Sequence, residues 1–179
     1  MTDDAALLHA LALIQERGAI GETSLERAVA HADQYAARVP RAATDAVDLG
    51  SGGGLPGLVI AVRCPWLHLT LVERRTKRAD LLRRAVSGLD LAERVAVVGD
   101  DVKKVADARP ASFDVVTARS FAAPTITLRW ASTLLRAGGV LLVSEPPGDD
   151  PERWPTNELE SRGLEDLGRE QGIRTFRRR

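Results

Sequence analysis

The chain has 179 residues, 44% of them hydrophobic and 28% charged, a composition typical of one globular domain large enough to bury its own core. Basic and acidic residues number 25 each, so the formal net charge is zero and no overall field draws the protein to nucleic acid or membranes. A single cysteine, Cys64, excludes a disulfide framework and suits a reducing compartment, so we expect a cytoplasmic location.

The N-terminal residues predict two helices and no targeting segment. The chain starts without the basic region of a signal peptide, and no apolar run approaches the ~20 residues of a membrane span. Apolar residues recur at helical spacing over 5–17, which predicts an amphipathic surface helix. A capping box with Thr23 as N-cap and Glu26 as its reciprocal partner predicts a second helix, which runs to about Arg38.

From residue 45 onward, strand-like and helix-like segments alternate, which indicates a parallel sheet. We therefore predict a helical appendage over 1–44 and an α/β domain over 45–179, with a mostly parallel seven-stranded sheet flanked by helices. The segments 164–167 and 173–177 are expected to pair as a closing antiparallel edge. The other strands are expected near 46–49, 67–73, 94–99, 113–117 and 138–144, and the helices near 56–64, 76–89, 101–108 and 123–136.

A glycine-rich segment over 47–57 separates a short apolar strand from an apolar helix, with Pro56 at the expected first helical position. Glycine permits positive φ and lets a ligand approach the backbone, so this turn predicts a cradle of N–H donors of nucleotide size. The dinucleotide fingerprint, counted from the first glycine, needs a glycine where Leu55 stands. A pattern of an acidic residue and three alternate glycines resembles the loop of Rossmann-like methyltransferases that use S-adenosylmethionine, and its members are Asp48, Gly50, Gly52 and Gly54.

Residues that follow the predicted strands are the next candidates, because ligands of doubly wound sheets lie at the carboxyl ends of the strands. Glu73 ends the second strand, where a carboxylate can accept both ribose hydroxyls of an adenosine. Asp100 and Asp101 end the third strand, and either can accept the adenine amino group or cap the next helix. Arg119 follows the fourth strand and would overhang the cofactor's carboxylate or the substrate.

Together these segments resemble the RsmG (GidB) family, whose members methylate a guanine N7 in small-subunit ribosomal RNA. The resemblance covers roughly 45–145 and implies a Rossmann-like methyltransferase fold with S-adenosyl-L-methionine as cofactor. It rests on Gly50-x-Gly52-x-Gly54-Leu55-Pro56-Gly57, Lys77-Arg78, Phe113-Asp114 and Ala118-Arg119-Ser120-Phe121-Ala122. The predicted cofactor contacts, from the strand ends and the resemblance together, are Asp48, Gly50, Ser51, Gly52, Gly54, Leu55, Glu73, Asp100, Asp101, Val102 and Arg119.

The chain departs from the family pattern on the substrate side. Lys103 stands where the family has an acidic residue after the third strand, and Glu145-Pro146 replaces a Lys-Gly after the fifth. The Asn-Leu-Thr segment expected before the second N-terminal helix is absent, which implies an N-terminally short member of the family.

The resemblance implies a reaction that needs alignment more than proton transfer. A sulfonium methyl is already activated and guanine N7 carries a free lone pair, so we expect no catalytic triad and no metal, with Arg119 as the one candidate for a catalytic role. Lys77 and Arg78 belong to a basic run that is either a solvated helix face or a phosphate-contacting patch for RNA or the small ribosomal subunit. His31 is predicted to form a lip of the substrate cleft.

Three other functions are left open. The zero net charge fits a methyltransferase that acts on a small molecule or a protein. A non-catalytic domain that binds an adenosine-containing ligand would need the same cradle. An NADP-binding oxidoreductase is suggested by Glu73-Arg74-Arg75 and disfavoured by the spacing of the glycines.

Overall fold

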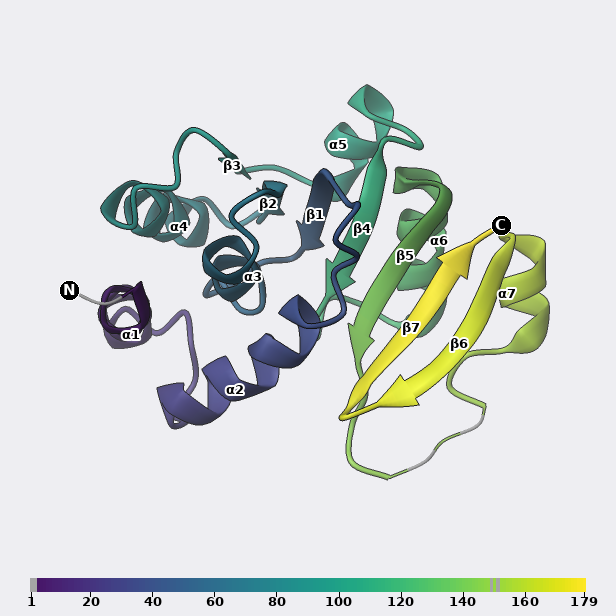
Figure 1. Ribbon diagram of the computed structural model, residues 1–179, viewed down its shortest axis with the longest axis horizontal. Coiled ribbons are helices and arrows are strands. Elements are labelled where there is room, and N and C mark those ends of the chain that lie inside the picture. Colours follow the sequence, from purple (N-terminus) through teal and green to yellow (C-terminus); the bar gives the residue numbers. More distant parts are fainter. Residues whose placement is uncertain (1–2, 149, 151) are drawn as a thin grey trace.

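The computed structural model describes residues 3–148, 150 and 152–179, which form a seven-stranded, mostly parallel sheet flanked by helices (Figure 1). The strand order is β3-β2-β1-β4-β5-β7-β6; the first five strands are parallel to one another, and β7 is antiparallel to both of its neighbours, β5 and β6. The strands are β1 (Asp45–Leu49), β2 (His68–Val72), β3 (Val95–Val98), β4 (Phe113–Ala118), β5 (Leu135–Ser144), β6 (Leu164–Glu170) and β7 (Ile173–Arg178). The helices are α1 (Asp3–Glu16), α2 (Leu25–Ala36), α3 (Gly57–Arg63), α4 (Thr76–Gly88), α5 (Val102–Ala108), α6 (Pro124–Leu134) and α7 (Thr156–Ser161).

The core lies on both faces of the sheet, because successive side chains of each strand point to opposite faces. In β5, for example, Leu142 joins the cluster on the face of α1 to α4, and Leu141 joins the cluster on the face of α5 to α7. Strands buried on both faces read as continuous apolar runs, which is why the sequence located the central strands well. The N-terminal helices share the first cluster through Leu7 and Tyr35, both fully buried.

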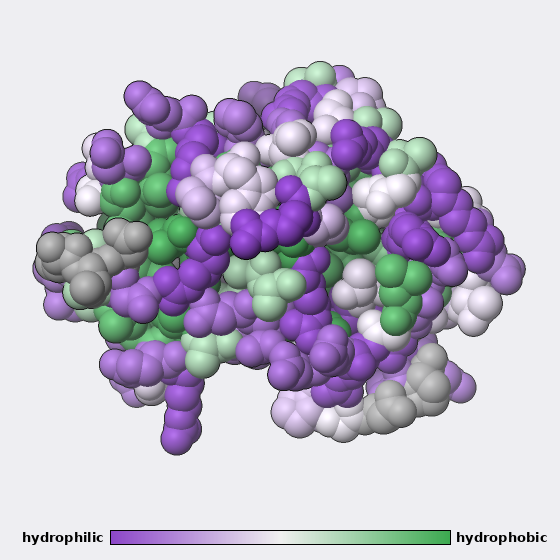
Figure 2. All heavy atoms as spheres, viewed as in Figure 1, coloured by the Kyte–Doolittle hydropathy of each residue, from purple (hydrophilic) through white to green (hydrophobic). Residues whose placement is uncertain are grey.

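The surface is mainly hydrophilic on the face shown in Figure 2, where apolar atoms are visible in separate areas. The large exposed apolar side chains of the described residues are Leu13, Ile126 and Leu167, and they come from different elements. Scattered exposure of this kind is ordinary for a globular protein. Within the described part of the chain, no helix combines the length and the apolar character needed to cross a bilayer.

The predicted capping box of α2 is wrong by one residue. Ser24, not Thr23, is the N-cap: its Oγ accepts a hydrogen bond from the Arg27 N–H at 3.3 Å. The same hydroxyl donates to Glu26 Oε2 at 2.6 Å. Glu26 therefore lies two residues after the N-cap, whereas a capping box has its glutamate three residues after it. The helix consequently starts at Leu25 and ends at Ala36.

We expect the substitution Ser24→Ala to lower the free energy of unfolding by about 1 kcal/mol, because it removes the acceptor for the first turn of α2. Urea denaturation followed by circular dichroism measures this loss. The matched control is Thr23→Ala, which should change the free energy of unfolding by no more than a few tenths of a kcal/mol. Equal losses in the two variants would contradict the assignment of the cap.

Two further boundaries and one additional helix differ from the predictions. Pro56 precedes α3 instead of occupying its first turn, with φ −88° and ψ −6°. Residues 135 and 136 belong to β5, so the preceding helix is shorter than predicted. Helix α7 was not predicted, because only Leu159 of its six residues is buried and its apolar periodicity is therefore weak. The predicted antiparallel edge is confirmed as β6 and β7, and β7 lies between β5 and β6.

Candidate functional site

Three cavities meet at the carboxyl ends of the central strands, and Ser120 lines all of them. We name each by its position: the Glu73 cavity (≈ 420 Å³), the glycine-loop cavity (≈ 460 Å³) and the Glu145 cavity (≈ 360 Å³). Ser120 has φ 51°, in the left-handed region that residues other than glycine seldom adopt. Strained backbone of this kind tends to occur at functional sites. Ser120 belongs to a segment that carries the family resemblance, but it was not among the predicted site residues, because only the fold reveals its backbone conformation.

The Glu73 cavity lies beyond β2 and β3, and the carboxylate of Glu73 ties its wall to the glycine loop. Glu73 is 6% exposed; its Oε2 accepts from the Gly52 N–H at 3.0 Å and its Oε1 from the Arg75 N–H at 2.8 Å. An ionised carboxylate can accept about four hydrogen bonds, so Glu73 retains capacity for two ligand hydroxyls. Other residues that line this cavity include Gly50, Asp100, Asp101, Val102, Ile126 and Trp130.

The two aspartates after β3, Asp100 and Asp101, make different contacts in the structure. Asp101 caps α5, because its Oδ1 accepts from the Lys103 N–H at 2.9 Å. Asp100 pairs with Lys104 at 2.6 Å and accepts from the Asp101 N–H, and these contacts, that of Lys104 first, lower the pKa of Asp100. Both aspartates line the Glu73 cavity, so capping does not remove Asp101 from the site.

The glycine loop contributes backbone to two cavities, but its glycines differ in what surrounds them. A Cβ added to Gly52, which has φ 55°, would have no neighbour closer than Gly50 O at 3.6 Å and Arg78 Nη1 at 3.8 Å. A Cβ on Gly53 would lie 2.3 Å from the side chain of Ile20, and one on Gly54 would lie 2.4 Å from that of Leu58. Packing within the protein therefore requires Gly53 and Gly54, whereas Gly52 borders open space.

Gly50 is partly covered by Phe121. The Phe121 ring would lie 2.8 Å from a Cβ on Gly50, and it lines both the Glu73 cavity and the Glu145 cavity. The ring therefore forms part of the wall of both cavities above the start of the glycine loop. Gly50 still lines the Glu73 cavity and the glycine-loop cavity, so the loop is not closed off.

Asp48 lies beneath the loop with 1% exposure. Its Oδ1 accepts from the Thr117 hydroxyl at 2.6 Å, and within the described residues its buried Oδ2 has no hydrogen-bond partner. Burial raises the pKa of Asp48, and the hydrogen bond from Thr117 opposes that shift.

Two of the predicted cofactor residues, Asp48 and Gly54, do not line any of the three cavities. The predicted cofactor residues that do line them are Gly50, Ser51, Gly52, Leu55, Glu73, Asp100, Asp101, Val102 and Arg119.

The predicted substrate residues lie in different places. His31 lines the Glu145 cavity from α2; burial first, and then the charge of Arg119, lowers its pKa. Arg78 lines both the Glu73 and the glycine-loop cavities. Lys77 is exposed and lines an adjoining surface groove, which we call the basic groove, together with Arg17, Arg75 and Arg78.

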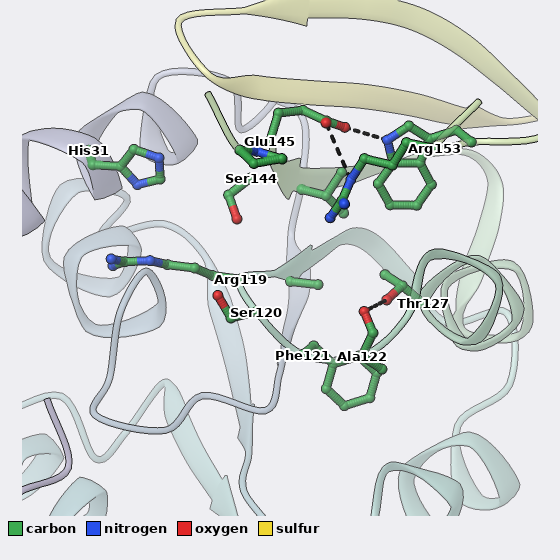
Figure 3. A pocket seen from close by; sticks show the side chains of 13 residues that line it. His31, Arg119, Ser120, Phe121, Ala122, Thr127, Ser144, Glu145 and Arg153 are labelled. Atoms are coloured by element: carbon green, nitrogen blue, oxygen red, sulfur yellow. Dashed lines mark hydrogen bonds and ion pairs between the residues drawn. The ribbon is translucent and has the colours of Figure 1, made fainter. Parts of the chain in front are cut away.

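The Glu145 cavity lies between the ends of β4 and β5. Figure 3 shows Glu145 and Arg153 on one side of it and Arg119, Ser120 and Thr127 on the other. The side chain of Glu145 is 6% exposed and lies 3.4 Å from Arg153 Nε and 3.5 Å from Arg174 Nε. The indole of Trp154 also donates to Glu145. Sequence reasoning missed Arg153 and Trp154, because they follow β5 across an irregular segment that carries no motif.

No metal centre was found among the described residues: nowhere do three or more histidine, cysteine, aspartate or glutamate side chains gather as ligands.

Comparison with known protein families gives one match that spans most of the fold. The pattern of the GidB family, described as rRNA small subunit methyltransferase G, matches residues 19–147. A ribosomal RNA small subunit methyltransferase G from Acidiphilium cryptum is 40% identical over 114 residues, covering 64% of this chain and 50% of the relative. Its counterpart from Salinispora tropica is 40% identical over 134 residues, covering 70% of this chain and 55% of the relative. The chain therefore spans about half the length of the curated relatives it matches.

Solved structures confirm the Rossmann-like methyltransferase fold. The mitomycin 7-O-methyltransferase MmcR superposes with a TM-score of 0.65 at 22% identity, covering 85% of this chain and 54% of that one. Cofactor-bound Rv0187 from MTB superposes with a TM-score of 0.66 at 18% identity, covering 100% and 90%. The [4+2]-cyclase SpnF has the same fold, with a TM-score of 0.66 at 22% identity, covering 83% of this chain and 62% of that one. A fold that is shared by such different proteins does not by itself establish the reaction.

Proposed function

The chain belongs to the GidB family of small-subunit rRNA methyltransferases, and on that premise we propose that it transfers a methyl group from S-adenosyl-L-methionine to a guanine N7 of 16S ribosomal RNA. The observation that carries this proposal is the meeting of three cavities at Ser120. A methyl transfer needs one space for the adenosine, one for the methionine and one for the acceptor, all open to a common point. We also propose a cytoplasmic location, where ribosomal RNA would be available.

The residues of the first two cavities fit S-adenosylmethionine. Glu73 has acceptor capacity for ribose hydroxyls, and Trp130 with Val102 supplies apolar surface for a purine. Gly52 leaves its backbone accessible in the glycine-loop cavity, where Arg119 can pair with a carboxylate. We assign the adenosine to the Glu73 cavity and the methionine to the glycine-loop cavity.

When bound, S-adenosylmethionine supplies a methyl group on a positively charged sulfur. An aligned lone pair of the acceptor can take this methyl group without a general base. The part of the protein is then to hold and orient. Arg119 lines both the glycine-loop cavity and the Glu145 cavity, so it can anchor the methionine carboxylate at the entrance to the acceptor side. His31, whose pKa is lowered chiefly by burial, is neutral at pH 7 and adds no charge there.

The basic groove supports RNA as the acceptor. Its cations are Arg17, Arg75, Lys77 and Arg78, and none of them makes an ion pair within the described residues. The groove adjoins the site, because Arg78 Nη1 would lie 3.8 Å from a Cβ on Gly52. A local cluster of unpaired cations on a chain of zero net charge favours a phosphate-contacting patch over a solvated helix face.

We expect the substitution Lys77→Gln to weaken RNA binding and to reduce the slope of log K against log salt by about 0.7, the value for one phosphate contact on a single strand. Fluorescence anisotropy with a labelled fragment of small-subunit RNA, at several salt concentrations, measures both quantities. The control is Lys103→Gln, since Lys103 pairs with Asp107 at 2.5 Å outside the groove. An unchanged slope in Lys77→Gln would remove this residue from the RNA contacts.

The direct test has two steps. Calorimetric titration with S-adenosylmethionine and with NADP should show binding of the first alone. Transfer of a labelled methyl group should then be detected on small-subunit RNA or ribosomal particles, with the label at guanine N7. Binding of S-adenosylmethionine without labelling of any RNA would reject the RNA acceptor.

A second candidate is a methyltransferase that acts on a small molecule. The Glu145 cavity, at ≈ 360 Å³, has the size of an ordinary small-molecule pocket. Labelling of RNA at guanine N7 would eliminate this alternative.

A further inference from the structure

Among the described residues that line the Glu145 cavity, two arginines stand against one carboxylate, although a glutamate replaces the lysine of the family pattern. The Glu145 side chain is almost completely buried and is paired with Arg153 and with Arg174 on β7, and Arg174 also pairs with Asp166 at 2.5 Å. Arg153 and Arg119 both line the cavity, and among the described residues that line it the one carboxylate, Glu145, is already paired with Arg153. The electrostatic character of this cavity therefore favours an anion.

Arg153 is held in place but retains free donors. Its Nε lies 3.4 Å from Glu145 Oε2, and its guanidinium carbon lies 5.6 Å from the centre of the Trp154 ring. Trp154 is itself fixed by its hydrogen bond to Glu145. Within the described residues the terminal nitrogens of Arg153 make no hydrogen bond, and the side chain is 31% exposed. A guanidinium oriented in this way can bind a phosphate with two parallel hydrogen bonds.

Arg119 and Arg153 differ in the cavities that they line. Arg119 lines the glycine-loop cavity as well as the Glu145 cavity, whereas among the three cavities Arg153 lines only the Glu145 cavity. Arg153 is therefore available to a ligand of the acceptor side whatever Arg119 binds.

We propose that the Glu145 cavity is an anion subsite, in which Arg153 binds the phosphate of the acceptor nucleotide and Glu145 positions Arg153. Arg119 also lines the cavity, but its side chain extends toward His31 and away from Arg153 (Figure 3). The identification of the ligand as a nucleotide rests on the proposed function. The role of Arg153 rests on the charge and geometry of the cavity.

The test compares a nucleotide with its nucleoside. In calorimetric titrations of the complete chain, 5′-guanylate should bind about tenfold more tightly than guanosine, because a hydrogen-bonded charge pair contributes a factor of this order. Arg153→Gln should reduce this preference to about twofold and leave the affinity for guanosine unchanged. Arg153→Lys, which keeps the charge but not the paired donors, should retain part of it. Inorganic phosphate alone should displace guanylate from the wild-type protein.

The matched control is Arg162→Gln. Arg162 pairs with Glu158 at 2.8 Å on α7 and has a similarly half-buried side chain, but it does not line the cavity. This variant should keep the full preference for guanylate. Because Arg153→Gln leaves Glu145 with one cation fewer, the double variant with Glu145→Gln is measured as well and should show the same loss.

Equal binding of guanylate and guanosine by the wild-type protein, or an unchanged preference in Arg153→Gln, would overturn the subsite. Failure of the proposed function has a different signature. In that case S-adenosylmethionine does not bind or RNA is not labelled, while the preference for guanylate and its dependence on Arg153 persist.

Discussion

Replacing Gly52 with valine should reduce the affinity for S-adenosylmethionine by about 100-fold or more. Gly52 has φ 55°, a conformation that costs a β-branched residue about 1–2 kcal/mol. The added Cβ would stand 3.6 Å from Gly50 O and 3.8 Å from Arg78 Nη1, so the rest of the valine side chain must extend into the glycine-loop cavity. Calorimetric titration measures the affinity directly.

Gly138→Val separates the loss of space from the strain of the backbone. Gly138 has φ 79° and no atom within 4 Å of an added Cβ, and it lies in the first half of β5, away from the carboxyl ends of the strands. This variant should lose stability to a similar extent and still bind the cofactor like the wild type. A folded Gly52→Val protein with unchanged affinity would show that the cofactor does not use the loop.

The sequence predicted the fold well wherever burial alone decides the structure. The central strands are continuous apolar runs because both of their faces are covered, as Leu141 and Leu142 show. It failed at the start of α2, where two adjacent hydroxyl residues compete for the same role. Thr23 has a glutamate three residues later and fits the capping motif, but the N–H that is reached belongs to Arg27, and only Ser24 lies close enough.

Part of the candidate site was also predictable, since residues that end parallel strands must share one edge of the sheet. That rule placed Glu73, Asp101 and Arg119 at the cavities. The pairing of Glu145 with Arg153 was not predictable, because it depends on how an irregular segment returns to the sheet.

The glycines of the loop show the same limit. The sequence does not distinguish Gly52, which borders a cavity, from Gly54, which is required by the packing of Leu58. Tertiary contacts alone separate a glycine that serves a ligand from one that serves the core.

The largest loss of stability is expected from Asp114→Ala, about 3 kcal/mol. The Asp114 side chain is 6% exposed, and its Oδ2 accepts from the N–H groups of Thr44 at 2.8 Å and Asp45 at 3.0 Å. The hydroxyl of Thr44 donates to the same oxygen, and Arg136 pairs with Oδ1. Alanine would leave these donors without an acceptor where β1 and β4 begin. Since the cavities lie at the other end of the strands, affinity for S-adenosylmethionine should not change.

The pH dependence of this loss distinguishes the ionic contribution from packing. Burial opposes the charge on Asp114, but the N–H donors of Asp45 and Thr44 and the charge of Arg136 outweigh it and lower its pKa below the ordinary 3.8. The unfolded chain therefore binds the proton more readily, so the ionic stabilisation is complete above about pH 4 and is lost as pH falls through the folded-state pKa. The raised pKa of Asp48 has the opposite effect on stability, but it is present in both proteins and cancels in their difference.

The difference in unfolding free energy between the wild type and Asp114→Ala should accordingly be constant near neutral pH and shrink below about pH 4. Urea denaturation of both proteins between pH 2.5 and pH 7 measures this difference. Asp114→Asn, which keeps the shape and one acceptor oxygen, should lose less stability and show a weaker dependence on pH. A difference that stays constant down to the lowest pH would mean that Asp114 stabilises the fold by packing alone, because a charge that is protonated in both states contributes nothing.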